Sequence, residues 1–411
     1  MSTDTPRLGV GMVGYAFMGA AHSQAWRTAG RFFDLPYRVD MTVLGGRNAD
    51  AARTAADRLG WGDVETDWRA LIARDDVDLV DVCTPGDTHA EIAVAALEAG
   101  KHVLCEKPLA NTVAEAEDMT RAAQAAAARG VRSMVGFNYR RVPALALARR
   151  IVASGRLGEL RHVRAQYLQD WIVDPQFPLV WRLRREVAGS GALGDIGAHI
   201  VDAAQFVTGE TVTGVSAVAE TFVKERPLLA ETSGGLAATG GSLEAGTGAV
   251  TVDDAAIFTA RLSGGGLGVF EATRFATGRK NAIRLEVNGS LGSLAFDFDA
   301  MNELLVHDAG ANADVAGWTR VQVTEATHPY VGAWWPPGHL LGYEHSFSHQ
   351  VVDLLGDIAA GRDPSPSFAD GLQVQRVLAA VEASAADESR WTPVDTTPVT
   401  IDEPVDALVR S

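Results

Sequence analysis

The chain has 411 residues, enough for two domains, and its 47% hydrophobic and 21% charged residues are ordinary for a globular protein. Its formal net charge of −16 argues against a nucleic-acid partner, because binding to phosphates requires a basic surface. There is no apolar run of the roughly 18 residues that a membrane span needs, so we expect no membrane partner. Two cysteines, Cys83 and Cys105, make neither a disulfide scaffold nor a zinc site. We therefore expect a cytoplasmic protein without a metal.

The first 140 residues alternate short apolar runs with segments of helical periodicity. We expect strands at 8–13, 38–45, 78–83, 101–105 and 131–137. The intervening helices are expected at 17–29, 48–59, 88–99 and 112–128, with Asn48 as the cap of the second. Strict alternation of this kind predicts a doubly wound parallel sheet that is covered by helices on both faces.

The pattern changes near residue 140. A helix at 143–154 is followed by expected strands at 160–169, 214–223, 253–262, 268–273, 281–289 and 292–298. Residues 237–248 are rich in glycine and small polar residues, which favours a mobile loop. Two helices, 343–360 and 368–386, close the pattern. This half therefore predicts an α/β domain built on a large, mostly antiparallel open sheet.

A glycine-rich turn joins the first expected strand to the first expected helix. Gly14, Ala16 and Gly19 occupy the three fingerprint positions of a dinucleotide-binding loop, with Phe17 and Met18 between the last two. Ala16 departs from the usual middle glycine but keeps the side chain small. The N–H groups that begin the helix would bind a pyrophosphate. These five residues are thus predicted to bind a dinucleotide on a Rossmann domain.

The second expected strand ends where an acidic residue normally binds the adenosine ribose. This chain has Gly46 and Arg47 there, followed by Asn48. No carboxylate repels a 2′-phosphate, and Arg47 is able to pair with one, which permits NADP. Asn48 or the backbone is equally able to bind the ribose of NAD, with Arg47 merely solvated. Gly46 and Arg47 are cofactor-binding candidates, and the choice between NAD and NADP stays open.

Two more loops follow expected strands of this sheet, at the edge where ligands bind. Thr84 and Pro85 end one strand, and they are candidates for lining the cofactor site. His89 is a candidate for the same site, although it is equally suited to packing its own helix. Glu106 and Lys107 end the next strand, beside the expected place of a nicotinamide.

Lys107 and a later Asp-x-x-x-His motif supply the candidate catalytic residues. Pro108 biases Lys107 away from a helix, so that the ammonium group is presented at the strand end. Asp195, His199 and Asp202 share one face of an expected helix that is thinned by small residues. A surface lysine and a structural His–Asp pair are the alternatives. A neutral histidine near a carboxylate, together with a lysine, is suited to taking the proton of an alcohol being oxidised.

These motifs resemble, in order, those of the glucose–fructose oxidoreductase/inositol dehydrogenase (Gfo/Idh/MocA) family: Gly14-Tyr-Ala-Phe-Met-Gly19, Thr84-Pro85, Glu106-Lys107-Pro108 and Asp195-Ile-Gly-Ala-His199. The resemblance implies an NAD(P)-binding Rossmann domain, residues 1–140, and a substrate-binding and oligomerisation domain, residues 141–411. It implies hydride transfer between a nicotinamide cofactor and a hydroxyl-bearing carbon of a sugar, anhydrosugar, glycoside or cyclitol. A homodimer or homotetramer would form through the open sheet.

The resemblance also assigns roles to residues. His199 would be the general base, Asp195 would bind a substrate hydroxyl and orient the imidazole, and Lys107 would hydrogen-bond the reacting oxygen. A sugar site needs polar side chains and an aromatic wall. The candidates for it are Asn138, Arg140, Trp171, Trp181, Arg274 and His339. For both tryptophans a place in the core is an equal alternative, and for Arg274 a solvent-exposed place is open.

Two other functions use the same scaffold. One is a glycosidase or lyase that oxidises its substrate transiently with a bound nicotinamide. The other is a non-catalytic ligand sensor, which would be expected to lose the lysine or the histidine. Because this chain keeps Lys107, Asp195 and His199, the sequence favours an enzyme.

Overall fold

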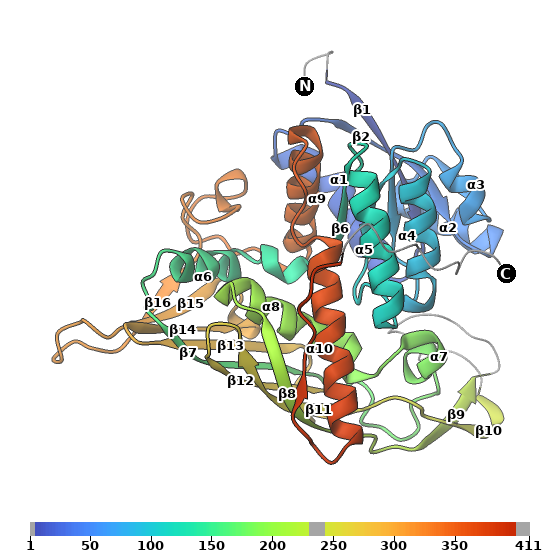
Figure 1. Ribbon diagram of the computed structural model, residues 1–411. Helices are drawn as coiled ribbons and strands as arrows, with labels where there is room; N and C mark the ends of the chain where they lie inside the picture. Colours follow the sequence, from blue (N-terminus) through green and yellow to red (C-terminus); the bar gives the residue numbers. More distant parts are fainter. Residues whose placement is uncertain (1–4, 230–242, 400–411) are drawn as a thin grey trace.

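A computed structural model describes residues 5–229 and 243–399 of the chain (Figure 1). The N-terminal half contains a six-stranded sheet in the order β3-β2-β1-β4-β5-β6, in which every pair of neighbours is parallel. Its strands are β1 (Arg7–Val13), β2 (Arg38–Gly45), β3 (Asp63–Glu65), β4 (Leu79–Val82), β5 (His102–Cys105) and β6 (Ser133–Val135). This is the strand order of a dinucleotide-binding fold, with a crevice where the order reverses.

Helices cover both faces of this sheet. They are α1 (Phe17–Phe32), α2 (Ala49–Leu59), α3 (Trp68–Ile72), α4 (His89–Glu98) and α5 (Val113–Ala127). Asn48 accepts a hydrogen bond from the Ala51 N–H and so caps α2 as the sequence predicts. A distant helix, α9 (Tyr343–Ala360), packs against α1 and buries Phe347, Val351 and Leu354 in the same core.

The second half holds a nine-stranded sheet in the order β16-β15-β14-β13-β7-β12-β11-β8-β17. Among the strand pairs of this sheet within residues 5–229 and 243–399, only the β7–β12 pair is parallel. The strands are β7 (Leu160–Leu168), β8 (Val212–Glu220), β11 (Ala255–Leu262), β12 (Leu267–Thr273), β13 (Ala282–Gly289), β14 (Gly292–Asp297), β15 (Glu303–Asp308), β16 (Trp318–Gln322) and β17 (Thr392–Pro393). The loop that joins β15 and β16 extends to the left in Figure 1.

One face of the nine-stranded sheet packs against helices. α8 (Ala198–Thr208) lies on β7 and β13, α10 (Phe368–Ala386) on β8, and α6 (Pro143–Ala153) on β14 and β15 (Figure 1). A further short helix, α7 (Arg185–Ala188), lies near the first sheet's loops. Side chains alternate between buried and exposed along β11. The opposite face therefore exposes apolar side chains, among them Val218 and Ile257, which are paired across β8 and β11, and Val269 on β12.

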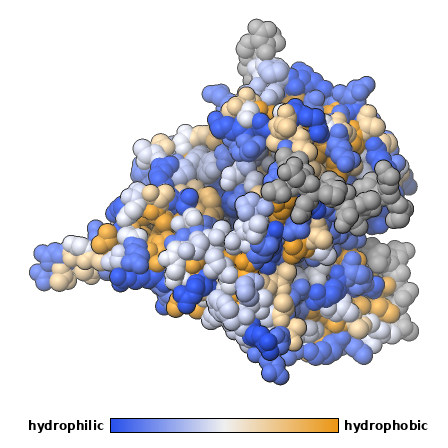
Figure 2. All heavy atoms as spheres, in the orientation of Figure 1, coloured by the Kyte–Doolittle hydropathy of each residue, from blue (hydrophilic) through white to orange (hydrophobic). Residues whose placement is uncertain are grey.

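The predicted fold class is confirmed: a doubly wound parallel sheet and a large, mostly antiparallel sheet. The loop expected at 237–248 is wrong in part, because Leu243–Ala249 forms strand β10, which pairs with β9 (Glu225–Leu229); residues 237–242 lie outside the described residues. The boundary at residue 140 stays a prediction. Within the described ranges, no helix has the length and apolar character required to cross a bilayer. Figure 2 shows hydrophilic residues over most of one face, with smaller apolar areas among them.

Candidate active site

A cleft of about 990 Å³ collects residues from both halves of the chain. It runs from the glycine-rich loop after β1, past the ends of β4 and β5, to the start of α8. Most of the predicted site residues line it: Gly14, Ala16, Phe17, Met18, Gly46, Arg47, Thr84, Pro85, His89, Glu106, Lys107, Asn138, Trp181, Asp195 and His199. One cavity thus joins the predicted nucleotide loop to the predicted catalytic residues Lys107, Asp195 and His199.

The glycine-rich loop leaves the start of α1 open to the cleft. Gly14 has a φ of +101°, and a Cβ atom there would lie 2.6 Å from the Cys83 carbonyl oxygen. Gly19 packs behind the loop, where a Cβ atom would lie 2.3 Å from the Gly14 oxygen. Ala16 caps α1 without a side-chain hydrogen bond, so the first N–H groups of the helix have no partner from this side chain. A helix start of this kind suits a pyrophosphate.

At the end of β2, close packing explains Gly46. A Cβ atom on Gly46 would lie 2.1 Å from the Tyr15 ring, so only glycine admits the ring there. Arg47 is exposed at the cleft, whereas the Asn48 side chain is used as the cap of α2. Arg47 is thus a cation at this end of the cleft, with the carboxylate of Asp87 also in the lining.

His89 ties two loops together. Its ring is 1% exposed, and its nitrogens lie 2.9 Å from the Thr84 carbonyl oxygen and 2.9 Å from the Pro108 carbonyl oxygen. Both nitrogens therefore face main-chain oxygens and neither is left to hydrogen-bond a cofactor, while His89 still lines the cleft, so its contact with a cofactor stays a prediction. The bonds hold the ends of β4 and β5 beside each other.

Lys107 and Asp195 meet at the centre of the cleft. Lys107 Nζ donates a hydrogen bond of 2.6 Å to the Asp195 main-chain oxygen and lies 3.6 Å from Asp195 Oδ1. Asp195 belongs to a wide helical turn, Leu193–Gly197, that precedes α8. Asp253 holds this turn by accepting hydrogen bonds from the N–H groups of Gly191 and Leu193, at 2.7 and 2.8 Å. The turn places the Asp195 side chain toward the cleft instead of along the helix.

Cations surround the Asp195 carboxylate. Arg274 is fully buried behind it, with Nη1 3.7 Å from Asp195 Oδ2, and Arg182 lines the cleft nearby. Burial alone raises the pKa of Asp195, but Lys107, Arg182 and Arg274 outweigh it and hold that pKa below its ordinary value. Asp195 is therefore an anion at neutral pH and accepts hydrogen bonds.

His199 is held by aromatic rings. The rings of Tyr139, Tyr167 and Phe137 lie 4.6, 5.9 and 6.1 Å from its centre. Within the described part of the chain its Nδ1 is buried with no hydrogen-bond partner, which leaves Nε2 as the nitrogen that a substrate reaches. Burial, aided by Lys107, puts the pKa of His199 well below its ordinary value, so the ring is neutral at neutral pH. The prediction that Asp195 orients this imidazole is wrong, because packing does so.

A chain of polar groups continues the wall beyond His199. The Tyr139 and Tyr167 hydroxyls are 2.9 Å apart, and Tyr167 donates to Asn281 Oδ1 at 2.7 Å. Gln169 Nε2 donates to the same oxygen at 2.8 Å. All four residues line the cleft. Together they supply the hydrogen-bonding surface that a polyol requires.

Four predicted substrate residues lie outside the cleft lining. Arg140 is buried, and its Nε contacts both Asp202 carboxylate oxygens at 2.9 and 3.0 Å. The Asp202 carboxylate is therefore paired with Arg140 and does not join Asp195 and His199 in the cleft lining. Arg274 is buried instead of solvent-exposed, and it stands behind Asp195. Trp171 packs on Phe177 with ring centres 5.2 Å apart, in a separate apolar cluster.

The fourth residue, His339, is exposed in the loop before α9, and its Nδ1 bonds to the Pro336 main-chain oxygen at 2.9 Å. Sequence reasoning in turn missed Tyr167, Phe298 and Tyr15. Tyr167 had a detectable cue: it shares the buried side of β7 with Val163 and Ala165, where a hydroxyl needs a partner.

Comparison with known proteins places the chain in a family. Residues 8–137 match the family described as an oxidoreductase family with an NAD-binding Rossmann fold, and residues 145–295 match the GFO/IDH/MocA C-terminal domain. Levoglucosan dehydrogenase from Pseudarthrobacter phenanthrenivorans is 42% identical over 392 residues, which cover 94% of this chain and 98% of that protein. Inositol 2-dehydrogenase from Rhizobium meliloti is 27% identical and covers 78% of this chain and 82% of its own length.

Solved structures agree with this comparison. An oxidoreductase domain protein from Kribbella flavida has a TM-score of 0.90 and 66% identity, and it covers 95% of this chain and 100% of its own. Levoglucosan dehydrogenase in complex with NADH and levoglucosan has a TM-score of 0.88 and 40% identity, with the same coverage. The chain is an NAD-binding oxidoreductase of the Gfo/Idh/MocA family. The family resemblance drawn from the sequence motifs is confirmed.

Proposed function

We propose that this enzyme oxidises a hydroxyl-bearing carbon of a pyranose-like sugar with NAD as hydride acceptor, and that levoglucosan, an anhydrosugar, is the first substrate to test. The observation that carries the proposal is that one cleft is lined both by the glycine-rich loop and by Lys107, Asp195 and His199. The extent of the similarity to levoglucosan dehydrogenase supports the choice of sugar.

In the proposed reaction Lys107, Asp195 and His199 each have one role. The glycine-rich loop would hold NAD, which would supply the acceptor for the hydride of the substrate carbon. His199 Nε2 takes the hydroxyl proton, because the ring is neutral at working pH. Lys107 Nζ donates a hydrogen bond to the same oxygen as negative charge develops on it. Asp195 accepts a hydrogen bond from a neighbouring hydroxyl and so fixes the sugar's orientation.

Groups around this set support a sugar as the substrate. The Arg182 guanidinium stacks on the Trp181 ring at 4.2 Å, and within the described residues it makes no hydrogen bond or ion pair. Its N–H groups are thus available to sugar hydroxyls. Asn281 uses its carbonyl oxygen for Tyr167 and Gln169, which leaves its NH₂ group for the ligand. Phe298 and Tyr343 add apolar faces for the C–H groups of a ring.

We also propose that the enzyme is a cytoplasmic homo-oligomer that associates through the open face of the nine-stranded sheet. Val218, Ile257 and Val269 are 55, 47 and 40% exposed there and face the same side. Contiguous exposed apolar side chains are typical of interfaces. Sedimentation of wild-type protein and of Ile257→Glu tests this, since a charge at that position would dissociate the oligomer. A monomeric wild-type protein would contradict it.

The test of the proposed function is NADH formation by the purified protein. NAD and NADP are each offered with levoglucosan, glucose, simple glucosides and myo-inositol. The proposal expects reduction of NAD with at least one anhydrosugar or pyranose, and levoglucosan as the best of the panel. No reduction with any sugar would contradict it. The levoglucosan and inositol enzymes named above are dehydrogenases, so the glycosidase or lyase alternative has no support from them.

A further inference from the structure

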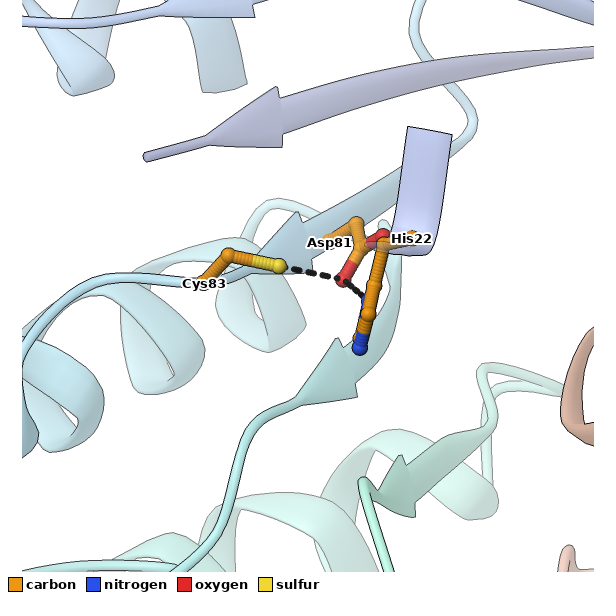
Figure 3. Close-up of side chains that lie close together, drawn as sticks. All are labelled: His22, Asp81 and Cys83. Carbon is orange, nitrogen blue, oxygen red and sulfur yellow. Dashed lines mark hydrogen bonds and ion pairs between the residues drawn. The ribbon is translucent and has the colours of Figure 1, made fainter. Parts of the chain in front are cut away.

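His22, Asp81 and Cys83 form a buried cluster of ionisable side chains (Figure 3), and Cys83 also lines the cleft. His22, on α1, is 1% exposed, and its Nδ1 lies 2.9 and 3.0 Å from the two carboxylate oxygens of Asp81 on β4. Its Nε2 lies 2.9 Å from Glu106 Oε1. Carboxylates accept hydrogen bonds and do not donate them, so both contacts form when both ring nitrogens carry a proton. His22 is then an imidazolium between two carboxylates.

Neighbouring groups agree with this charge state. Burial lowers the pKa of His22, but Asp81 first and Cys83 second outweigh it, and the pKa lies well above its ordinary value. The other titratable side chains close by are the thiols of Cys83 and Cys105, and burial raises the pKa of both. Both thiols therefore keep their protons, and two carboxylates remain to balance the imidazolium.

The cluster is not suited to a metal ion, although His22, Asp81 and Cys83 place three potential ligand atoms within 4.8 Å of one another. Both ring nitrogens of His22 lie on carboxylate oxygens, and the indole N–H of Trp26 donates to Asp81 Oδ2 at 2.7 Å, so these atoms already have hydrogen-bond partners. Cys83 Sγ itself points to Asp81 Oδ1 at 3.5 Å. Hydrogen bonds and charge thus account for the cluster without an ion.

Glu106 connects the cluster to the chemistry. Its side chain is 4% exposed, with Oε1 on His22, while Oε2 accepts a hydrogen bond of 3.2 Å from the main-chain N–H of Lys107. Gly136 closes the space behind it, since a Cβ atom there would lie 2.7 Å from Glu106 Oε1. The Glu106 carboxylate therefore has one fixed position, and the backbone of Lys107 is bonded to it.

We propose that His22 is a positioning residue for the reaction: it fixes Glu106 and, through Glu106, the backbone from which Lys107 reaches the substrate. This role rests on the proposed function, because it places a lysine whose task is to bind the reacting oxygen. α1 thereby links the start of the nucleotide loop to the lysine. Displacement of a reacting group by about 1 Å costs on the order of a hundredfold in rate.

A double-variant cycle with His22→Gln and Glu106→Gln tests this proposal by comparing kcat and KM for the sugar. If His22 acts through Glu106, His22→Gln lowers kcat by on the order of tenfold or more and changes the sugar KM far less. The double variant is then no slower than Glu106→Gln alone. Two losses that multiply, or a wild-type kcat in His22→Gln, would overturn the proposal.

His349→Gln is the matched control. This histidine is also fully buried and also uses both ring nitrogens, toward Trp334 and the Arg141 main-chain oxygen, but it lies outside the cleft lining. It is expected to lose stability and keep its kcat. A fall in kcat equal to that of His22→Gln would mean that the loss of a buried histidine, and not of Glu106, slows the enzyme, and would overturn the proposal.

NMR spectroscopy of ¹⁵N-labelled protein tests the same proposal without sugar turnover. In protein with ¹⁵N-labelled histidine, both His22 ring nitrogens are expected to be protonated at about pH 8, where a free histidine is neutral. In ¹⁵N-lysine protein, the Lys107 ammonium resonance is expected to move in Glu106→Gln and in His22→Gln, but not in His349→Gln. A neutral His22 ring or an unmoved Lys107 resonance overturns the positioning role. Absence of sugar oxidation by the wild type, with both signatures present, contradicts only the proposed function.

Discussion

Lys107 Nζ donates a hydrogen bond of 2.6 Å to the main-chain oxygen of Asp195, a residue 88 positions further along the chain. The bond joins the end of β5 in the parallel sheet to the wide turn before α8 on the second sheet. Lys107 also lies 3.6 Å from Asp195 Oδ1, and its side chain is only 12% exposed. The two halves of the chain therefore meet at the ammonium group that the proposed reaction uses.

Replacement of Lys107 tests that group directly. Lys107→Met keeps the length of the side chain and removes the charge, and we expect kcat to fall by on the order of 10²–10³-fold, as for loss of one donor to a developing oxyanion. The affinity for NAD, measured by fluorescence titration, is expected to change little. Lys280→Met is the control, since Lys280 is an 84% exposed lysine paired with Asp170. Turnover that survives in Lys107→Met would refute the role.

The pH profile tests His199. Its pKa lies well below the ordinary histidine value, so the base is free at neutral pH and becomes protonated only in acid. We expect kcat/KM to rise with pH along an acidic limb that lies below the ordinary value of about 6.5, and to be flat above it. His199→Ala should lose most activity and that limb. An identical limb in the residual activity of the variant would place the base elsewhere.

Arg140 separates a structural role from a substrate role. It forms a buried pair with Asp202, and removal of one partner leaves an uncompensated charge. Arg140→Met is expected to lower the free energy of unfolding by about 3–5 kcal/mol and to leave the sugar KM unchanged. Urea unfolding and steady-state kinetics measure the two quantities. Adding Asp202→Leu to the Arg140→Met variant should recover part of the lost free energy of unfolding. A raised sugar KM in Arg140→Met would contradict this assignment and would mean that Arg140 binds the substrate.

Short motifs carried most of what the sequence could predict. Gly14, Lys107 and Asp195 belong to short motifs of neighbouring residues, and such motifs are recognised in the sequence without knowledge of the distant contacts that place them. Elements with clear periodicity were found within a few residues, and the helices at 343–360 and 368–386 were found with the observed bounds.

The misassigned residues depend on distant partners. Arg140 is defined by Asp202, 62 positions away, and Arg274 by a strand end and a turn that pack together only in the fold. Composition and periodicity do not encode which charged side chain meets which. The strand Leu243–Ala249 was mistaken for a loop because its glycines mask a pairing that its partner strand supplies. Buried His22 was missed for the same reason, since its two carboxylate partners are 59 and 84 positions away, on β4 and just after β5.

Acid should destabilise the fold in part through His349. Trp334 Nε1 donates to its Nε2, Nδ1 bonds to the Arg141 main-chain oxygen, and burial lowers the pKa to about 3. Below about pH 6.5 the unfolded chain binds a proton that the folded one does not, so stability is lost as pH falls from there toward 3, by at most about 1.4 kcal/mol per unit. His349→Gln should show a shallower dependence in urea unfolding near pH 5 and 7. Equal slopes would contradict this assignment.

Arg47 tests cofactor choice. It is the exposed cation at the end of β2, where a carboxylate normally contacts the ribose. We expect Arg47→Asp to repel a 2′-phosphate and to lower kcat/KM with NADP, relative to NAD, by about tenfold, which corresponds to about 1.4 kcal/mol. Steady-state kinetics with each cofactor measure the ratio. An unchanged ratio would mean that Arg47 is merely solvated.

The measurement that most directly tests the account is deuterium transfer. The purified enzyme is incubated with NAD and with the best sugar of the panel, in which deuterium replaces the carbon-bound hydrogens. The mass of the reduced cofactor is then measured by mass spectrometry. Direct hydride transfer in the cleft predicts one deuterium in each reduced nicotinamide. A reduced cofactor without deuterium, or no reduced cofactor with any sugar, would contradict the account.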